Sequence, residues 1–449
     1  MPPEQLLQAS AFPTKRFFMD MLTRDIALED ALLDLVDNSI DALGRTRHID
    51  FTTDLFAGPS AAVSSRLGAP SVSIELSNDR FRVADNCGGI PLRSALTEVF
   101  RIGRTIDSTE ASLGVYGIGL KRALFKIGKR IKIISRTTED GFEVDLNLAD
   151  WSKDDDNWDI PLRETKPVKS YLKAGTEIII EDLNPAIVMR LEDGLFKKRL
   201  SDLIATTYSL FLQGYLAINL DGKSIEARSI PIGVSKEVTP AVERFDSEGV
   251  SVTLIAALAE RRDGEWNAES AGWYVLCNGR VVVGADKTEL TGWGLQGARF
   301  VSKYRGFIGI AFFSSKNPHD LPWTTTKRGL NLDSPVFQRA RAKMSVVSKP
   351  VLNFLNRMYA SDAPEEINER QVADNVRSVD VRKLAVSERS TFEVHERSRR
   401  TPPTTVNVQY QAERVDIERI KRRLRKPSWS AGRVGRYTLD YFIGQEFSE

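Results

Sequence analysis

The stretch Gly114-Val115-Tyr116-Gly117-Ile118-Gly119-Leu120-Lys121, which runs into Arg122-Ala123-Leu124-Phe125-Lys126-Ile127, is one of three motifs that together indicate the fold of this chain. Glycines that open a helix expose backbone N–H groups at its positive end, and a lysine in the first turn adds a mobile charge, so the stretch is suited to holding phosphates. Flexible loops and dinucleotide-binding folds also contain glycine trios. Here Arg122 stands where a dinucleotide fingerprint requires its third glycine, and no apolar strand leads into the loop. A dinucleotide fold is therefore disfavoured, although Glu139 and Asp140 lie about twenty residues downstream.

A second motif lies in an apolar-periodic run from about Ile26 to Leu43, and this periodicity predicts a helix. Side chains three or four positions apart share a helix face, so one arc of the helix is acidic and polar. That arc contains Asp34, Asp37, Asn38 and Asp41. It is either a solvated face or a site for a hydrated divalent ion and an activated water, because magnesium keeps several waters and takes few protein oxygens.

The third motif is Val83-Ala84-Asp85-Asn86-Cys87-Gly88-Gly89-Ile90-Pro91. It follows an alternating pattern that predicts a hairpin of residues 71–76 and 81–83, with residues 77–80 as the turn. By itself the motif is an ordinary Asx turn. The alternative is that an aspartate at a strand end, followed by glycines, places one carboxylate at the lip of a pocket where the backbone can approach a ligand closely.

In this order the three motifs resemble the Bergerat-fold (GHKL) ATPases, which include gyrase, heat-shock-90 chaperones, histidine kinases and MutL. The form Tyr-Gly-Ile-Gly-Leu-Lys at residues 116–121 is most similar to MORC-type ATPases and their prokaryotic relatives. A fourth element, Gly175-Thr176-Glu177-Ile178-Ile179-Ile180, resembles the Gly-Thr strand that closes the adenine pocket in that family. The resemblance covers roughly residues 15–185 and extends more faintly to about residue 345.

The resemblance implies ATP and Mg²⁺ as cofactors and assigns a role to individual residues. Asn38 is expected to coordinate the metal through its side-chain oxygen. Asp85 is expected to accept a hydrogen bond from the adenine amino group, which selects adenine over guanine by pairing one buried acceptor with one donor. Gly89 would let the backbone pass the base, Gly117, Gly119 and Lys121 would hold the phosphates, and Thr176 would complete the adenine contacts. The full set expected at the cofactor is Asn38, Asp41, Asp85, Gly89, Ile90, Gly114, Gly117, Ile118, Gly119, Leu120, Lys121 and Thr176.

Two positions depart from the family pattern. The residue four positions before the asparagine is usually a glutamate that orients the attacking water, and here it is Asp34. Aspartate is shorter by one methylene, about 1.5 Å, whereas a general base must lie within roughly 2.6–3.2 Å of its proton or act through a water. Asp34 is the expected catalytic base, and Asp37 is the alternative. Because Asp34 is shorter than glutamate, ATP hydrolysis that is slow or that needs a partner protein is also expected. Cys87 replaces the first glycine of the adenine motif, so the backbone there must avoid positive φ or bear strain.

The pattern changes after the nucleotide-binding motifs. Residues from about 190 to 213 are expected to be helical, and strands are expected at residues 217–220, 250–258 and 272–283. Within the last of these, Asn278-Gly279 is a type I′ hairpin signal, and an Asn-Gly-Arg hairpin recurs in the transducer domain of MutL-like and MORC-like proteins. In such families the transducer sends one basic residue from a polar loop to the terminal phosphate. Lys327 is our candidate, Arg328 is its rival, and a plain surface lysine is the alternative.

These observations predict an α+β chain of three parts. A Bergerat-type α/β sandwich that binds ATP is expected over residues 1–188, a transducer domain resembling ribosomal protein S5 over residues 189–350, and a basic, partly helical region over residues 351–449. The two cysteines cannot build a disulfide framework, and three dispersed histidines do not suggest a zinc site. We found no apolar run long enough to span a membrane and no signal peptide, so a cytoplasmic location is expected.

The carboxyl-terminal region is rich in arginine. Residues 371–408 are polar and are expected to form a linker or exposed segment, and residues 412–426 to form a charged helix. From Val376 to Arg436 there are 16 Lys and Arg against 7 Asp and Glu, whereas the net charge of the whole chain is only +2. The excess is either a solvated basic tail or a contact to DNA or RNA phosphates or to an acidic partner protein. Without a base-reading motif, nucleic-acid binding would be tolerant of sequence.

Three classes of function remain. The favoured class is an ATP-gated machine, in which ATP closes a lid at roughly residues 92–116, orders residues 13–25 against a second protomer, and serves DNA handling or defence against foreign DNA. Dimerisation is implied by the resemblance. The second class is a sensor kinase, which is disfavoured because no dimerisation helix with a histidine precedes the ATP motifs. The third is a binding module or a subunit that needs a partner. Chaperones, mismatch-repair endonucleases and topoisomerases are variants of the first class.

Overall fold

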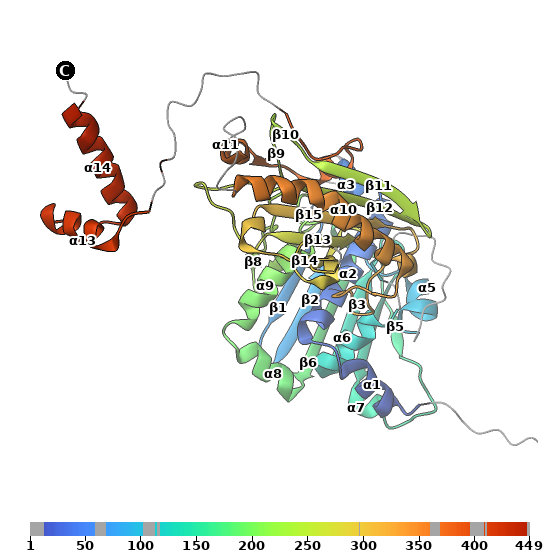
Figure 1. The fold of residues 1–449 in the computed structure, drawn as a ribbon. Helices are drawn as coiled ribbons and strands as arrows, with labels where there is room; N and C mark the ends of the chain where they lie inside the picture. The colour runs from blue at the N-terminus through green and yellow to red at the C-terminus, as the bar shows by residue number, and fades with distance from the viewer. Residues whose placement is uncertain are drawn as a thin grey trace, which may run out of the picture. The chain divides into compact units, whose positions relative to one another are not determined.

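The computed structural model describes residues 13–58, 69–101, 113–114, 117–295, 297–359, 369–395, 408 and 411–446. The described residues form two compact units, one within residues 13–395 and the other within residues 411–446 (Figure 1). The first unit contains two large sheets with helices packed against them, and the second contains two helices. The predicted α+β class is confirmed.

The first sheet has eight strands in the order β5-β4-β3-β6-β2-β1-β7-β8. All neighbouring pairs are antiparallel except β1 and β7. The strands are β1 (Ser71–Leu76), β2 (Arg80–Asp85), β3 (Gly128–Arg136), β4 (Gly141–Asn147), β5 (Leu162–Glu164), β6 (Gly175–Leu183), β7 (Ala217–Leu220) and β8 (Lys223–Ser224). The predicted hairpin of residues 71–83 is confirmed as β1 and β2. Because β7 and β8 follow residue 188, the sheet extends past the end of the predicted first domain.

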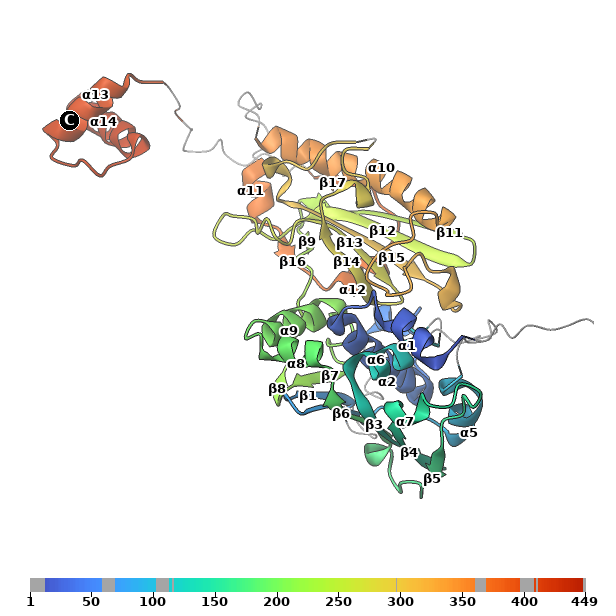
Figure 2. The ribbon, with the colours of Figure 1, turned by 90° about the horizontal axis from the view of Figure 1, so that it is seen from below.

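Helix α2 (Leu28–Arg47) is the central helix of the first unit and confirms the helix predicted from Ile26 to Leu43. Acidic residues in its first turn and basic residues in its last turn suit the helix dipole, and the helix ends at His48, whose φ of 53° is left-handed. It packs against α6 (Gly119–Ile127), and α1 (Lys15–Thr23) packs against α6 in turn. In Figure 2 these three helices lie between the two sheets. Most residues of α2 from Leu28 to Leu43 are buried.

The helical stretch predicted at residues 190–213 is divided. Helix α8 (Pro185–Glu192) ends before Asp193, and α9 (Phe196–Thr207) begins after Leu195. The Asp193 carboxylate accepts a hydrogen bond from the Leu195 backbone N–H at 2.9 Å. Such an Asx turn competes with the helical hydrogen bonds and separates the two helices. The other short helices of this part are α3 (Asp54–Ala57), α5 (Leu92–Ser94), the π-helical turn η1 (Ala95–Val99), α7 (Leu148–Trp151) and the 3₁₀ turn η2 (Tyr171–Lys173).

The second sheet has five strands in the order β11-β12-β15-β13-β14. Helix α10 (Pro335–Met358) packs against β12, β15 and β11. The strands are β11 (Ala241–Ser247), β12 (Val250–Leu258), β13 (Gly272–Cys277), β14 (Arg280–Asp286) and β15 (Phe307–Ser314), with 3₁₀ turns η3 (Glu289–Thr291), η4 (Ser302–Tyr304) and η5 (Pro318–Asp320). Asn278 and Gly279 have φ of 44° and 82°, both positive as a type I′ turn requires, so the predicted hairpin is confirmed.

Residues 371–395 do not form the linker or exposed segment that their polarity predicted. They contain α12 (Val381–Ala385) and most of α11 (Glu369–Asp374), and two short strands, β16 (Arg377–Ser378) and β17 (Glu393–Val394). These strands pair with β9 (Gly233–Val234) and β10 (Val238–Thr239) of the first unit. Val376 is fully buried. The prediction was wrong because the few apolar residues of this segment complete the core, while its many charged side chains face outward.

The second unit contains α13 (Arg414–Arg423) and α14 (Ala431–Glu446). The charged helix predicted at residues 412–426 is confirmed as α13. Val434 is the buried residue of α14, and α13 has none. Among the described residues, no helix is both long and apolar enough to cross a membrane.

Candidate functional site

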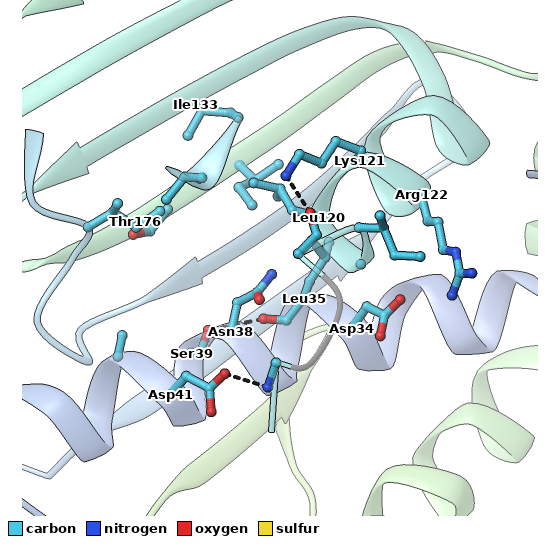
Figure 3. A pocket seen from close by; sticks show the side chains of 18 of the residues that line it. Asp34, Leu35, Asn38, Ser39, Asp41, Leu120, Lys121, Arg122, Ile133 and Thr176 are labelled. Atoms are coloured by element: carbon cyan, nitrogen blue, oxygen red, sulfur yellow. Dashed lines mark hydrogen bonds between the residues drawn. The ribbon is translucent and has the colours of Figure 1, made fainter. Parts of the chain in front are cut away.

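A pocket opens beside α2 in the first unit (Figure 3). Its walls come from α2, from β2, β3 and β6, from the segment that leads into α6, from residues 94–100, and from the loop at residues 325–327. The predicted site residues that line it are Asp34, Asn38, Asp41, Asp85, Ile90, Gly114, Gly117, Ile118, Gly119, Leu120, Lys121, Thr176 and Lys327. Of the predicted set, Gly89 stands outside this lining and adjoins Ile90. The structure thus brings together residues that lie as far apart in the chain as Asp34 and Lys327.

A row of polar side chains lies at the β-sheet end of the pocket. The Asp85 carboxylate accepts hydrogen bonds from Ser39 Oγ at 2.9 Å, from the Cys87 backbone N–H at 2.8 Å and from the Thr176 N–H at 3.4 Å. Thr176 Oγ1 lies 2.9 Å from Ser135 Oγ. Burial raises the pKa of Asp85, and these donors oppose the rise. Ser39 and Ser135 were not among the predicted site residues, although a serine beside Asn38 on a buried helix face was an available signal.

Two glycines allow the backbones to meet at this end. A Cβ at Gly89, whose φ is 77°, would lie 2.4 Å from the Arg136 carbonyl oxygen. A Cβ at Gly175 would lie 1.9 Å from the Asp85 carbonyl oxygen. Cys87 has no positive φ, so a side chain replaces the family's glycine there without backbone strain. The backbone segments at Gly89 and Gly175 therefore approach their neighbours closely even though Cys87 replaces the first glycine of the motif.

Asp34 faces the pocket from α2 (Figure 3). Its Oδ2 atom is buried and has no hydrogen-bond partner among the described residues. Its Oδ1 atom lies 3.5 Å from Lys327 Nζ. Burial raises the pKa of Asp34 above its usual value, and the nearby Lys327 ammonium opposes that rise. A Cβ at Gly119 would lie 2.9 Å from Asp34 Cγ, so the start of α6 approaches this carboxylate closely.

Behind Asp34 lies a buried charge cluster, which we define as Asp37, Tyr208, Arg280 and Lys327. The Asp37 carboxylate accepts hydrogen bonds from Lys327 Nζ at 2.7 Å, from Arg280 Nε at 3.1 Å and from the Tyr208 hydroxyl at 2.7 Å. Although burial raises the pKa of Asp37, Arg280 and Lys327 outweigh it and hold the pKa below its usual value. Tyr208 and Arg280 were missed as site residues, and Asp37 was named only as an alternative base. The contacts join positions between 171 and 290 residues apart, which no local pattern reveals.

The glycine-rich stretch forms the opposite wall. Gly117 has φ of 63°, Ile118 precedes α6, and α6 begins at Gly119. Lys121 Nζ donates to the Gly117 carbonyl (Figure 3). Burial lowers the pKa of Lys121 to about 8. A backbone of exposed N–H groups with one partly desolvated ammonium is suited to an anion.

Asp41 holds the end of the predicted lid. Its two carboxylate oxygens accept hydrogen bonds from the backbone N–H groups of Leu113 at 2.6 Å and Gly114 at 2.8 Å. Burial raises the pKa of Asp41, and these bonds oppose that rise. Residues 102–112 and 115–116, which make up much of the predicted lid, lie outside the described residues.

Asn38 exposes its amide to the pocket from the same helix (Figure 3). Within the described part of the chain, no three His, Cys, Asp or Glu side chains are grouped to hold a metal ion. One amide oxygen in this position is suited to a hydrated Mg²⁺ that takes its other ligands from phosphate and water.

Comparison with known families agrees with this geometry. Residues 26–177 match the family model described as "Histidine kinase-, DNA gyrase B-, and HSP90-like ATPase". No curated protein matches the chain. The match spans the pocket from α2 to the start of β6, and it supports the Bergerat (GHKL) superfamily together with ATP binding and hydrolysis in general.

Proposed function

We propose that this protein is a MORC-type ATPase that hydrolyses ATP to ADP and phosphate and uses ATP to close a homodimer, in DNA handling or in defence against foreign DNA. One observation carries the proposal: a free carboxylate oxygen of Asp34, the glycine-rich stretch and Lys327 border one pocket. A base, a phosphate cradle and a cation from the second half of the chain are what phosphoryl transfer to water requires.

At the sheet end, Asp85 would accept the exocyclic amino group of adenine. The carboxylate already accepts hydrogen bonds from Ser39, Cys87 and Thr176, so its orientation is fixed before a ligand enters. A guanine would present an oxygen at that place and leave two acceptors facing each other. Selection of adenine nucleotides follows from this one acceptor.

At the other end, Asp34 would take the proton of the attacking water through its free oxygen. Its raised pKa suits a general base, because such a base is most effective when its pKa is near the working pH. Lys121 and the N–H groups before α6 would hold the phosphates, and Lys327 would neutralise charge on the terminal phosphate. Asn38 would hold Mg²⁺, which supplies charge neutralisation of the phosphate oxygens when bound.

Dimer closure is supported by helix α1. Phe17 and Met21 lie four residues apart on one helix face and are 60% and 54% exposed. Two large apolar side chains on an exposed face near the amino terminus are suited to contact a second protomer. The face lies within residues 13–25, the segment that the resemblance assigns to dimerisation.

DNA contact is supported by the second unit. Its helix α13 carries four exposed arginines, Arg414, Arg419, Arg422 and Arg423, whereas Lys421 is mostly covered and pairs with Glu418 at 2.9 Å. A row of exposed cations attracts phosphates without reading bases, so binding should weaken steeply with salt.

A second function is an ATP-dependent switch or binding subunit that needs a partner for turnover. It is favoured by the contact of Lys327 Nζ with Asp37, since an engaged ammonium is not free to meet a phosphate. In that case ATP would be held and released without rapid hydrolysis.

The test is phosphate release from ATP by the purified chain, with and without duplex DNA. Asp34→Asn serves as the blank, and Asp263→Asn, an exposed position outside the pocket, is the matched control. Turnover by the wild type and the control but not by the blank supports the ATPase, and stimulation by DNA supports DNA handling. ATP binding without turnover supports the switch, and a chain that binds no ATP would refute both functions.

A further inference from the structure

Lys327 stands between the pocket and the charge cluster. Its ammonium lies 2.7 Å from Asp37 Oδ2 and 3.5 Å from Asp34 Oδ1, and the side chain is almost fully buried. Lys327 and Asp34 line the pocket, whereas Asp37 lies fully buried behind them. The carboxylate closest to this cation is therefore one that does not face the pocket.

Asp37 does not depend on Lys327 for compensation of its charge. Arg280 Nε lies 3.1 Å from Asp37 Oδ1. The Tyr208 hydroxyl lies 2.7 Å from the same oxygen and 2.8 Å from the Leu33 carbonyl oxygen, so its one hydrogen is shared between two acceptors. The Oδ2 atom is the one that Lys327 occupies. Removing the only cation from a buried carboxylate is strongly unfavourable, but here one cation and one hydroxyl would remain.

The backbone at residue 327 is held independently of its side chain. Arg280 donates through an Nη1 hydrogen to the Lys327 carbonyl, and the residue has a left-handed φ of 55°. Arg280 thus fixes both Asp37 and the loop that carries the lysine. The ammonium at the end of a flexible four-carbon stem can change partners while its loop stays in place.

We propose that Asp37 is the resting counter-ion of Lys327 and a positioning residue of the ATPase, and that the terminal phosphate of ATP takes the ammonium over from it. Arg280 and Tyr208 stay with Asp37 when the lysine leaves. This inference rests on the proposed function, because it takes Lys327 as the cation of the terminal phosphate. Asp37 then sets how much of the ATP binding energy is used to break a buried ion pair.

The exchange has a signature that a structural role would not produce. ADP lacks the terminal phosphate, so its binding leaves Lys327 on Asp37. Weakening the Asp37–Lys327 pair should strengthen binding of ATP but not of ADP. Strengthening the pair should do the opposite. The ratio of the ATP and ADP dissociation constants therefore reports the strength of the Asp37–Lys327 pair. A change that damages the whole pocket would alter both constants and leave their ratio the same.

The experiment is calorimetric titration of the full chain, once with ATP and once with ADP. The ATP titration is completed before the chain turns over the nucleotide. Asp37→Asn removes the charge that holds Lys327, so ATP should bind about tenfold more tightly while ADP affinity is unchanged. In the Lys327→Met background, which has no ammonium to release, Asp37→Asn should leave the ratio unaltered. An equal change in ATP and ADP affinity would overturn the counter-ion assignment.

Tyr208→Phe keeps the test decisive if Asp37→Asn does not fold. It deletes one hydroxyl from Asp37, which then holds Lys327 more tightly, so ATP affinity should fall relative to ADP. Tyr304→Phe is the matched control, because Tyr304 is also a buried tyrosine but its hydroxyl donates a hydrogen bond to Asn356 and not to Asp37. A ratio that neither Asp37→Asn nor Tyr208→Phe moves overturns this inference alone. A wild-type chain that binds no ATP overturns the proposed function as well.

Discussion

Asp85 illustrates how much selectivity one side chain can carry. Three donors fix the carboxylate, and it borders the pocket at the end of β2. A buried acceptor that has been oriented in advance discriminates strongly between a ligand with a donor and one without, because the mismatched pair leaves polar groups unsatisfied. In the proposed function, selection of adenine by Asp85 would therefore depend on hydrogen-bonding character rather than on size.

Replacing Asp85 by Asn should weaken binding of adenine nucleotides about tenfold or more and leave the fold intact. The amide keeps the shape but presents a donor where the adenine amino group needs an acceptor, a loss of about 1–3 kcal/mol or more. Fluorescence titration with ATP and a thermal melt measure both effects. Asp79→Asn, in the exposed turn of the same hairpin, is the control. Unchanged ATP affinity in Asp85→Asn would refute the adenine assignment.

Lys121 predicts a pH dependence of ATP affinity. Burial lowers the pKa of this ammonium to about 8, whereas a phosphate favours its charged form. The charged form is populated at pH 7 and is lost as pH rises through 8, so ATP affinity should fall about tenfold between pH 7 and pH 9. Lys121→Gln should bind ATP more weakly at pH 7 and lose this part of the dependence. Lys129→Gln, an exposed change, should keep it. A Lys121→Gln profile parallel to the wild type would contradict the assignment.

Helix α2 is the element on which the site is built, and it shows what sequence alone can and cannot give. Its periodicity predicted both the helix and an arc that holds Asp34, Asp37, Asn38 and Asp41. The roles of the carboxylates were not predictable. Asp34 faces the pocket, Asp37 faces Arg280 and Asp41 faces Leu113. These differences depend on partners that tertiary folding brings to each side of the helix, and periodicity describes one helix alone.

Removing the Asp41 carboxylate should release the end of the lid from α2. Asp41→Ala leaves the Leu113 and Gly114 N–H groups without their acceptors, which costs about 1–3 kcal/mol for each group that stays buried. We expect faster amide hydrogen exchange at these two positions and weaker ATP binding, with little change in global stability. Asp41→Asn keeps one acceptor oxygen and should lie between the wild type and Asp41→Ala. Exchange rates equal to the wild type would show that the lid end is held by other contacts.

In residues 371–395 the composition predicted the wrong structure, whereas the sequence motifs predicted the elements around the pocket correctly. Residues 371–395 are polar, yet they add two strands and Val376, Val381, Leu384 and Phe392 to the first unit. A few apolar residues spaced irregularly do not produce a periodic signal, so their burial follows from the surfaces they meet. The arginine-rich character persists in the second unit, where α13 has no buried residue.

Two truncations should separate these regions. A chain ending after residue 396 keeps the first unit whole, so ATP binding and thermal stability should match the full chain, while affinity for duplex DNA and its salt dependence should fall with the loss of α13. A chain ending after residue 370 also loses buried apolar side chains, each worth about 1.5–3 kcal/mol, and should unfold at a lower temperature. Differential scanning calorimetry and DNA binding at two salt concentrations distinguish the two losses.

Equal DNA affinity of the full chain and the 396-residue chain would make the second unit a protein-contact element. Equal stability of the two truncated chains would show that residues 371–395 contribute nothing to the core.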